Sequence, residues 1–565
     1  MPGTENKLFQ PVPYRIRIGV TGHRSLADEA AIRVLVKKVL ETEIDGLFDP
    51  ESRLLIERGR RENAPPVLYS VLTPLAEGAD RLVANVVREF PQSRLDAVLP
   101  LVEEDYLEDF ATEESRREFR ELLGLCRRPV RLRKTRIQAD ARNESHAGEL
   151  RRAAYESAGH YVVSHCDVLI AIWDGREARG RGGTANIVKY AEEQRRPFIR
   201  IWKDETEIVS VNRGDGLNAS ALADVAAFNN ADVSPADRRG YVDNLEKDYF
   251  RPFEDGSQPV SEESKDLVRT CLFPYYVQAS RQAKKYQSRF LNAGIAVYIF
   301  SALAVGCVAA ALLFPALSVI AYAAEFILLL IILWTVFRAH HSRANERWME
   351  NRFLTERIRS GIYVAIAGVD VPPVEVLPFM GHSHTVDDWT VRVFDEIWHR
   401  MPRFPDCGDN CAVLARYIRE RWIEGQIRYH IGKQKRSRRW GSILSWSGRV
   451  LFLMTMAAAG FKLWMKSSPG LVPDEHWMNP ALAMVAILAP ATAASMVGLR
   501  AQREYLRNEK RSKNILPQLQ YLNNRLAAST EPAMFESVIL QVDEVMLRET
   551  QEWLMLMRYI DLEAA

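Results

Sequence analysis

Residues 291–337 read LNAGIAVYIFSALAVGCVAAALLFPALSVIAYAAEFILLLIILWTVF, and this stretch decides the class of the protein. Positions 291–314 hold 24 residues without a charge, and positions 317–337 carry one acid, Glu325. A helix needs about 20 apolar residues to cross the hydrocarbon core of a bilayer. Only a hairpin fits the short link at Pro315, so the sequence predicts two adjacent transmembrane helices. The alternative is a buried helical hairpin in a large soluble protein.

A second apolar pair follows later in the chain. Residues 443–464 contain Arg449 and Lys462, whose long side chains can reach opposite interfaces of a membrane. Residues 480–499 carry no charge, and the link between the two stretches, KSSPGLVPDEHWMN, is short and polar. This pattern predicts a second transmembrane hairpin, with an interfacial or soluble helix pair as the alternative.

Basic residues flank the outer ends of both hairpins, whereas the hairpin turns carry almost none apart from Lys466. The flanking residues are Arg281, Lys284, Lys285, Arg289, Arg338, Arg343, Arg347, Lys433, Lys435, Arg436, Arg438, Arg439, Arg500, Arg503, Arg507, Lys510, Arg511 and Lys513. Cytoplasmic segments of membrane proteins carry the excess of Lys and Arg. We therefore expect both termini and segment 338–440 in the cytoplasm.

The composition excludes several other classes of protein. Lys+Arg 75 against Asp+Glu 73 gives a formal net charge of +2, which excludes a polycation or an acidic disordered chain.

The basic runs lie beside the predicted membrane spans, so lipid headgroups are their simpler partner and no nucleic acid is expected. Six scattered cysteines fit a reducing compartment. The spacing of Cys407 and Cys411 is wider than the CxxC pairs of zinc sites, so no metal site is expected.

Residues 14–202 alternate strand signals with helix signals. Such alternation predicts an α/β domain with a parallel sheet covered by helices on both faces. The predicted strands are 15–20, 67–72, 94–100, 167–173 and 197–202. Ligands of such sheets bind at the carboxyl ends of the strands, so the turns that follow the strands are the places to search for a site.

Three glycine-containing turns lie at those ends: GVTGHR at 19–24, LAEGADR at 75–81 and GRGGT at 180–184. Glycines let the backbone approach a ligand, arginine can form paired hydrogen bonds with phosphate, and a helix N-terminus attracts anions. Each turn alone is more often only a turn, but three at one sheet edge point to a ligand. The candidate ligand-binding residues are Gly19, Thr21, Gly22, His23, Arg24, Glu77, Gly78, Asp80, Gly182, Gly183 and Thr184.

The trio GVTGHR, LAEGADRLVA and CDVLIAIWDG…GGT resembles the SLOG superfamily over about residues 14–202. The resemblance implies a Rossmann-like domain that binds nucleotides or nucleotide-derived signals through the residues just named. LOG-type phosphoribohydrolases carry a glutamate in a PGGxGTxxE pattern, whereas this chain has Ile187 at that position. We therefore expect no catalytic residue and favour sensing. A membrane-tethered nucleotide N-glycosidase or hydrolase remains the alternative, and no Walker lysine indicates a P-loop NTPase.

The helices beside the first and second hairpins, RWMENRFLTERIRSG and QIRYHIGKQKRSRRW, resemble the SLATT class of bacterial transmembrane effectors. Together the two resemblances imply an effector of antiviral defence in the bacterial inner membrane, which senses a nucleotide second messenger and forms a pore or depolarises the membrane. Its partners would be that messenger, the lipid bilayer and further copies of itself, and no cofactor is expected. A constitutive channel or scaffold with a structural SLOG domain is a further alternative.

Glu325 is the pore candidate, because an ionisable group within a span is costly unless it faces water or a partner. The predicted division of the chain places a SLOG-like domain first and a connector second. Two transmembrane hairpins, separated by a cytoplasmic helical segment, follow, and a cytoplasmic helix ends the chain. The predicted segments are 1–202, 203–280, 281–368, 369–432, 433–530 and 531–565.

Overall fold

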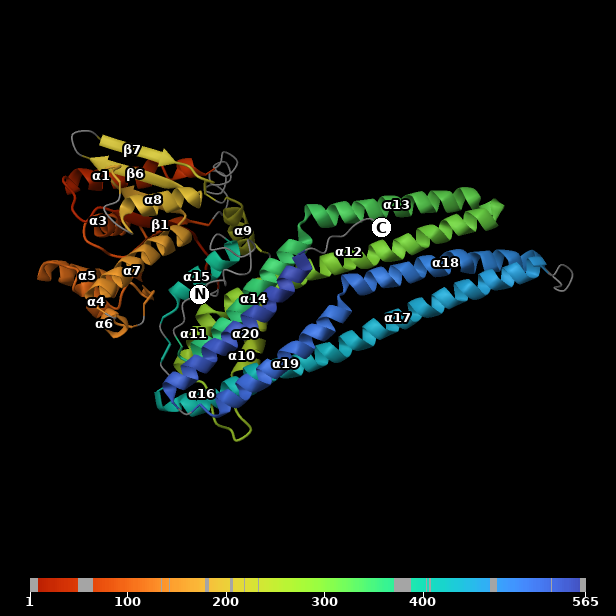
Figure 1. The fold of residues 1–565 in the computed structure, drawn as a ribbon. Helices are drawn as coiled ribbons and strands as arrows, with labels where there is room; N and C mark the ends of the chain where they lie inside the picture. The colour runs from red at the N-terminus through yellow and green to blue at the C-terminus, as the bar shows by residue number, and fades with distance from the viewer. Residues whose placement is uncertain are drawn as a thin grey trace, which may run out of the picture. The chain divides into compact units, whose positions relative to one another are not determined.

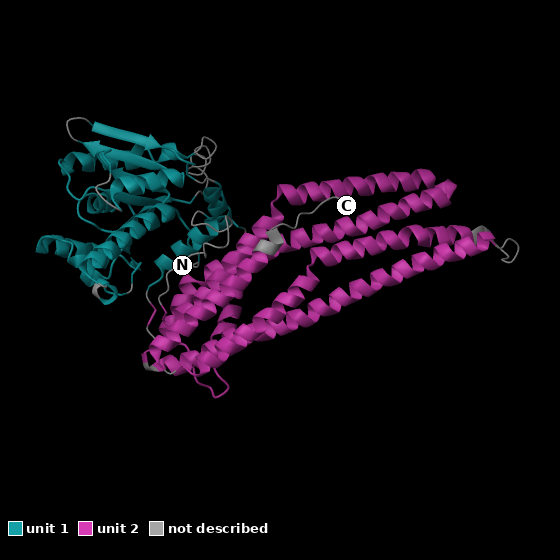
Figure 2. Ribbon diagram, viewed as in Figure 1, with its two compact units in different colours: residues 1–232, 372–402 teal, residues 233–371, 403–565 magenta. Residues whose placement is uncertain are grey.

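The computed structural model divides the chain into two compact units (Figure 2). Unit 1 comprises Met1–Asp232 with Pro372–Pro402, and unit 2 comprises Val233–Val371 with Arg403–Ala565. The chain therefore passes from one unit to the other three times. The structure describes residues 9–48, 65–133, 135–141, 143–177, 182–203, 207–217, 219–231, 233–369, 388–402, 404–405, 408–467, 475–529 and 531–558.

Unit 1 is built on a seven-stranded sheet in the order β4-β3-β2-β1-β5-β6-β7 (Figure 1). Neighbouring strands from β4 to β6 run parallel, and β7 pairs antiparallel with β6. The predicted parallel α/β sheet is confirmed. The strands are β1 (Tyr14–Gly22), β2 (Val67–Thr73), β3 (Arg94–Leu99), β4 (Val130–Arg131), β5 (Val168–Ile172), β6 (Phe198–Lys203) and β7 (Glu207–Asn212).

Strand β5, VLIAI, which lies between β1 and β6, is buried at all five positions because helices cover both faces of the sheet. Leu169 and Ala171 face a core formed with α7 (Glu144–His165) and α8 (Thr184–Glu193). The alternate residues of β5 face the other way. On that face lie α1 (Glu29–Thr42) and α3 (Ala79–Val87), which contact each other and β1, β2 or β6. The strand order runs outward from β1 in both directions, and right-handed crossovers in opposite directions place their helices on opposite faces of the sheet.

Segment 203–280, predicted as a connector, forms regular elements. In unit 1 they include β7 and α9 (Ala219–Asn229), and in unit 2 they include α10 (Pro235–Tyr249) and α11 (Glu262–Cys271). Ser234 and Ser261 begin α10 and α11 by accepting hydrogen bonds from backbone amides three residues later. Short polar helices of this kind lack the strong apolar period that reveals longer ones.

Unit 1 also contains α15 (Trp389–Arg400), which comes from the segment between the two hairpins. Its apolar residues Val393 and Ile397 are buried, and Trp389 packs against Phe228 of α9 with 5.8 Å between ring centroids. The remaining helices of the unit are α4 (Glu103–Leu107), α5 (Glu113–Leu125) and α6 (Ile137–Asp140).

Unit 2 is helical, and within the described ranges four of its helices are long and apolar enough to cross a membrane. These are α12 (Phe273–Leu313), α13 (Ser318–His341), α17 (Glu424–Ser467) and α18 (Glu475–Gln502). The predicted apolar stretches lie within them except for Phe314 and Leu317 at the first link. Helix α12 contacts α13, and α17 contacts α18. Large apolar side chains such as Val319 and Ile320 are 80% and 70% exposed, as lipid-facing residues are.

Small residues bring α12 and α18 together. A methyl group at Gly498 would lie 2.4 Å from Tyr298, and one at Gly306 would lie 3.2 Å from Leu488. Membrane helices approach closely where glycine leaves the backbone bare. This contact joins the first hairpin to the second, so the four apolar helices form one bundle.

The two hairpins end alike. A left-handed residue, Arg343 with φ of 45°, separates α13 from α14 (Ala344–Ile366). Its counterpart Glu504, with φ of 50°, separates α18 from α19 (Tyr505–Ala527). In both hairpins the second apolar helix therefore stops at a bend and a polar helix follows, which supports a shared plan for the two halves.

The polar helices of unit 2 form a packed core of their own. Phe353, Leu354 and Ile358 of α14 are fully buried, and α14 contacts α12 and α20 (Pro532–Arg558). Tyr363 stacks on Trp422 with 4.9 Å between ring centroids. Trp422 belongs to a π-helical segment (Ile418–Ile423) that joins α16 (Cys411–Tyr417) to α17.

Candidate functional site

The first two predicted turns are joined by backbone contacts at the carboxyl edge of the sheet. The amide of Ala79, the first residue of α3, donates to the carbonyl of His23 at 3.1 Å. A Cβ at Gly78, where φ is 76°, would lie 2.3 Å from the carbonyl oxygen of Arg24. A Cβ at Gly22 would lie 2.4 Å from that of Ala79. Glycine is therefore required at both positions by close approach, and this packing alone accounts for them.

His23 lies where the ends of β1, β5 and β6 converge. Its Nε2 is 3.2 Å from Oδ1 of Asp174, which follows β5, and its ring centroid is 5.1 Å from that of Trp202 on β6. The amide of His23 donates to the carbonyl of Ile172 at 3.0 Å, which fixes the backbone of the turn against β5. Asp174 has a lowered pKa although burial opposes this, because the amide of Arg176 and His23 stabilise the carboxylate.

Arg24 is exposed and its guanidinium lies 5.6 Å from the ring centroid of Tyr155 on α7. The Tyr155 hydroxyl donates to the carboxylate of Asp109, which also pairs with Arg151. Gly182 of the third turn, with φ of 78°, packs on the next residue of α7, since a Cβ there would lie 3.0 Å from the amide nitrogen of Glu156. The first and third turns therefore border the same part of α7.

The two acids of the second turn already have protein partners. Glu77 accepts a hydrogen bond from the hydroxyl of Ser115 on α5. Asp80 is buried and accepts from the amide of Ala76 at 3.1 Å. Burial raises the pKa of Asp80 to about 7, although hydrogen bonds from Ala76 and Thr73 oppose the shift. Asp80 therefore stabilises the backbone of the second turn from a buried position.

The third turn begins α8, with Gly183 as the N-terminal cap and Thr184 as the first helical residue, half-exposed. Ile187, one turn further on, is buried and packs into a notch on α7, where a Cβ at Gly159 would lie 2.3 Å from its Cδ1. The position at which LOG-type enzymes carry their glutamate is therefore a core position here. Gly19 lies inside β1, where a Cβ would lie 2.8 Å from Cys166 and Val162.

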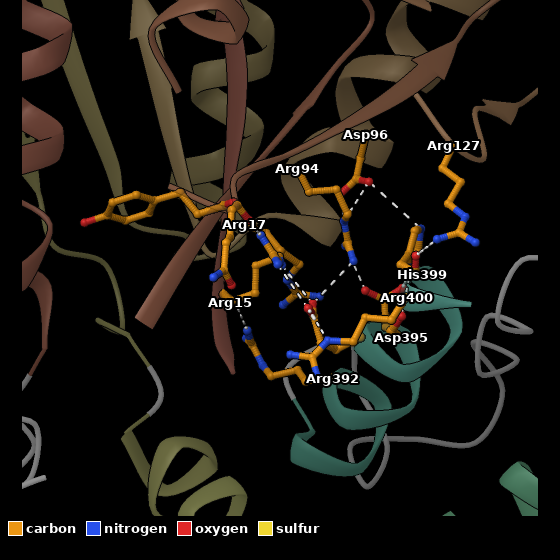
Figure 3. Close-up of polar contacts among 12 residues, drawn as sticks. Arg15, Arg17, Arg94, Asp96, Arg127, Arg392, Asp395, His399 and Arg400 are labelled. Carbon is orange, nitrogen blue, oxygen red and sulfur yellow. Dashed lines mark hydrogen bonds and ion pairs between the residues drawn. The ribbon is translucent and has the colours of Figure 1, made fainter. Parts of the chain in front are cut away.

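A second polar cluster, which sequence reasoning missed, joins α15 to the opposite, amino-terminal edge of the sheet (Figure 3). Arg15 near the start of β1 forms a paired contact with Glu396, with Nε to Oε2 at 2.8 Å and Nη2 to Oε1 at 3.0 Å. Arg17 and Arg392 both bind the carboxylate of Asp167, which precedes β5. We call these five residues, with Arg94 and Asp395, the α15 cluster.

Arg94, the first residue of β3, forms the remaining ion pair of the α15 cluster. Arg94 Nη2 lies 2.8 Å from Asp395 Oδ2, and His399 Nδ1 lies 3.1 Å from Asp395 Oδ1. Burial opposes ionisation of Asp167, Asp395 and Glu396, yet the facing arginines hold all three pKa values below their ordinary range. The α15 cluster therefore consists of fully charged, mutually paired groups that fasten α15 across the starts of three strands.

The sequence carries no local pattern that identifies this cluster, because Arg15 and Glu396 are 381 positions apart. Knowledge of which distant residues are in contact was needed. Within the described residues no group of His, Cys, Asp and Glu is arranged to hold a metal ion. Comparison with models of known protein families gives no match for this chain, and comparison with curated proteins gives none either.

Proposed function

We propose that the protein is a membrane effector in which unit 1 binds a nucleotide-derived signal and the apolar helices of unit 2 form or open a pore. The three turns, with Arg24 and Thr184, are the ligand-binding edge in this proposal. It rests on the resemblance of those turns to the SLOG superfamily and on four helices suited to a membrane. A role in bacterial antiviral defence follows from the same resemblance.

The observation that carries the proposal is the position of α15 in the chain. It follows the first hairpin and precedes the second, yet it belongs to the sheet unit. Both of its flanks continue into unit 2, so the chain connects the sheet edge that holds α15 to the segments leading to both hairpins. A ligand shifts such an equilibrium only if it binds one state more tightly than the other.

The test uses full-length protein, because α15 completes unit 1. Thermal stabilisation across a panel of nucleotides, cyclic nucleotides and dinucleotides would first identify a ligand. Liposomes loaded with a fluorescent dye and carrying the protein should then be tight without that ligand and leaky with it. Equal leakage in both conditions would overturn the gated effector, and release of free base from the ligand would replace it with a hydrolase.

Glu325 on α13 supplies a second readout of the same experiment. It is half-exposed on a helix that carries many exposed apolar side chains, where an acid is costly unless it faces water or a partner. Glu325→Gln should change ion selectivity or conductance and leave ligand binding unchanged. An unchanged conductance would remove Glu325 from the pore without affecting the gating result.

A further inference from the structure

A cavity of about 450 Å³ lies within unit 2, among the polar ends of the long helices. Its walls come from α12, α14, α17, α19 and α20 and from the last residue of α18. A volume of this size fits a small organic ligand. Six basic side chains line the cavity, against two acidic ones. The basic residues are Lys284, Arg352, Arg359, Lys433, Arg503 and Arg511.

The two acids form ion pairs with only half of these cations. Glu356 pairs with Arg352 at 2.5 Å and also with Arg359, and Glu549 pairs with Arg511 at 2.9 Å. The other three, Lys284, Lys433 and Arg503, have no carboxylate partner within 4.0 Å among the described residues. The cavity therefore concentrates positive charge that unit 2 itself leaves uncompensated.

Concentrated like charges are costly away from bulk water. Lys433 precedes the apolar stretch 443–464 and is half-buried, and burial together with Arg511 lowers its pKa to about 8. An anion bound between these groups would remove the repulsion. Arginine and lysine together are the usual protein ligands of phosphate, since guanidinium forms paired hydrogen bonds and ammonium supplies a point charge.

An unpaired polar group points to the same conclusion. The side chain of Gln502 lines the cavity and is 5% exposed, and neither its amide nitrogen nor its amide oxygen has a hydrogen-bond partner. It lies over the bare backbone of Gly294 on α12, where a Cβ would approach its amide nitrogen to 1.8 Å. Buried amides are nearly always hydrogen-bonded, so an unpaired one in a cavity wall marks a place for a polar ligand.

The cavity lies close to the ends of two apolar stretches. Leu291 begins the first stretch and also lines the cavity, and Arg503 follows soon after the fourth stretch ends at residue 499. Trp348 and Trp553 add aromatic surface beside the cations. We propose that this cavity binds a phosphate-bearing anion, supplied either by the headgroup of an anionic phospholipid or by a soluble phosphate compound. This site is distinct from the ligand-binding edge of unit 1.

Neighbouring lysines provide a matched test. Lys284 and Lys433 line the cavity, and Lys284 is also exposed to solvent, whereas the exposed Lys285 and Lys435 on the same two helices do not line it. Full-length K284Q/K433Q and K285Q/K435Q would be compared with the parent protein in neutral detergent. The probes are inorganic pyrophosphate at constant ionic strength and mixed micelles of phosphatidylglycerol, with phosphatidylcholine micelles as the lipid control. The readout is the thermal unfolding midpoint as a function of probe concentration.

We expect at least one anionic probe to stabilise the parent protein and the K285Q/K435Q variant equally. K284Q/K433Q should bind that probe at least about tenfold more weakly, because each lost charge-assisted hydrogen bond is worth about tenfold or more. Stabilisation by pyrophosphate alone identifies a soluble anion as the source, and stabilisation by phosphatidylglycerol alone identifies a lipid. Equal weakening in both double variants, or no stabilisation by either probe, would overturn the site.

Discussion

Asp80 carries a buried carboxylate at the start of α3, and its surroundings oppose its ionisation. Its pKa is raised from 3.8 to about 7 mainly by burial. A raised pKa favours the protonated acid in the folded protein. The resulting stability is complete below pH 3.8 and is lost as the pH rises through 7. At pH 8 the folded protein therefore holds an unfavourable charge beneath the second turn.

Asp80→Asn should remove this pH dependence. A shift of about 3 pKa units corresponds to roughly 4 kcal/mol, so the variant should gain a few kcal/mol relative to the parent protein between pH 5 and pH 8. Thermal unfolding of the detergent-solubilised protein at both pH values measures the difference. Asp215→Asn, at an exposed acid of the same unit, serves as the control. A gain that is the same at pH 5 and pH 8 would contradict the buried-charge explanation.

The ligand-binding edge makes a separate prediction at Thr184 and Arg24. Thr184→Arg would fill the N-terminus of α8 and should abolish nucleotide binding, whereas Gln194→Arg adds the same charge at the other end of that helix and should not. Arg24→Ala should weaken binding by roughly 1.5–3 kcal/mol, the range of a charge-assisted hydrogen bond. Calorimetry with the identified ligand measures both. Binding that survives in Thr184→Arg would place the site elsewhere.

Residue identities predicted the polar turns but not the direction of each side chain. Glu77 and Asp80 looked equally suited to a ligand, yet Glu77 bonds to Ser115 and Asp80 is buried beneath the backbone. Which side of a turn faces inward depends on α5 and α3, and these contacts are not encoded in the turn itself. Ile187 was more informative, because an apolar residue at a helix position already indicates the core.

At the scale of elements, the sequence predicted long buried strands and long apolar helices. It did not predict contacts between elements that are far apart in the chain. Strand β5 and the four apolar helices are local patterns whose length alone identifies them. The two-residue strand β4 carries too few residues for a pattern. Helix α15 has an amphipathic sequence, but its partners Arg15 and Asp167 lie more than 200 positions away. Its assignment to unit 1 required the three-dimensional structure.

Removing the Glu396 carboxylate, which pairs with Arg15, Arg94 and Arg400, should release α15. Glu396→Gln leaves the nearly buried Arg15 without its carboxylate, and losing one partner of a buried pair costs roughly 3 kcal/mol. Amide hydrogen exchange over 389–400 should then accelerate by about 100-fold, since each 1.4 kcal/mol is tenfold. Glu192→Gln on α8 removes an exposed acid of the same unit and should leave the exchange unchanged.

The same variant also distinguishes ligand binding by unit 1 from transmission of the signal to the apolar helices. The α15 cluster lies at the amino-terminal edge of the sheet, and the ligand-binding turns lie at the carboxyl edge. Glu396→Gln should therefore retain ligand binding but lose ligand-dependent leakage from liposomes. If leakage persists with α15 released, the signal does not pass through this helix.

On the scale of the whole molecule, the two hairpins repeat one plan, with a basic segment, two apolar helices in contact with each other and a left-handed bend. Arg343 and Glu504 mark the bends. Two such hairpins place the start of the first, the end of the second and everything between them on one side of a membrane.

The orientation can be tested with reporters fused after residues 402, 472 and 529. The positive-inside rule predicts cytoplasmic signals at 402 and 529 and a signal from the opposite side at 472. Neutralising Lys433, Lys435 and the arginines 436, 438 and 439 should reduce the opposite-side signal at 472, because these residues hold the start of the third span inside. A fully cytoplasmic reporter at 472 in the parent protein would remove the second hairpin from the membrane. A pore would then have to be built from α12 and α13 alone, and the close packing of α12 on α18 would need another explanation.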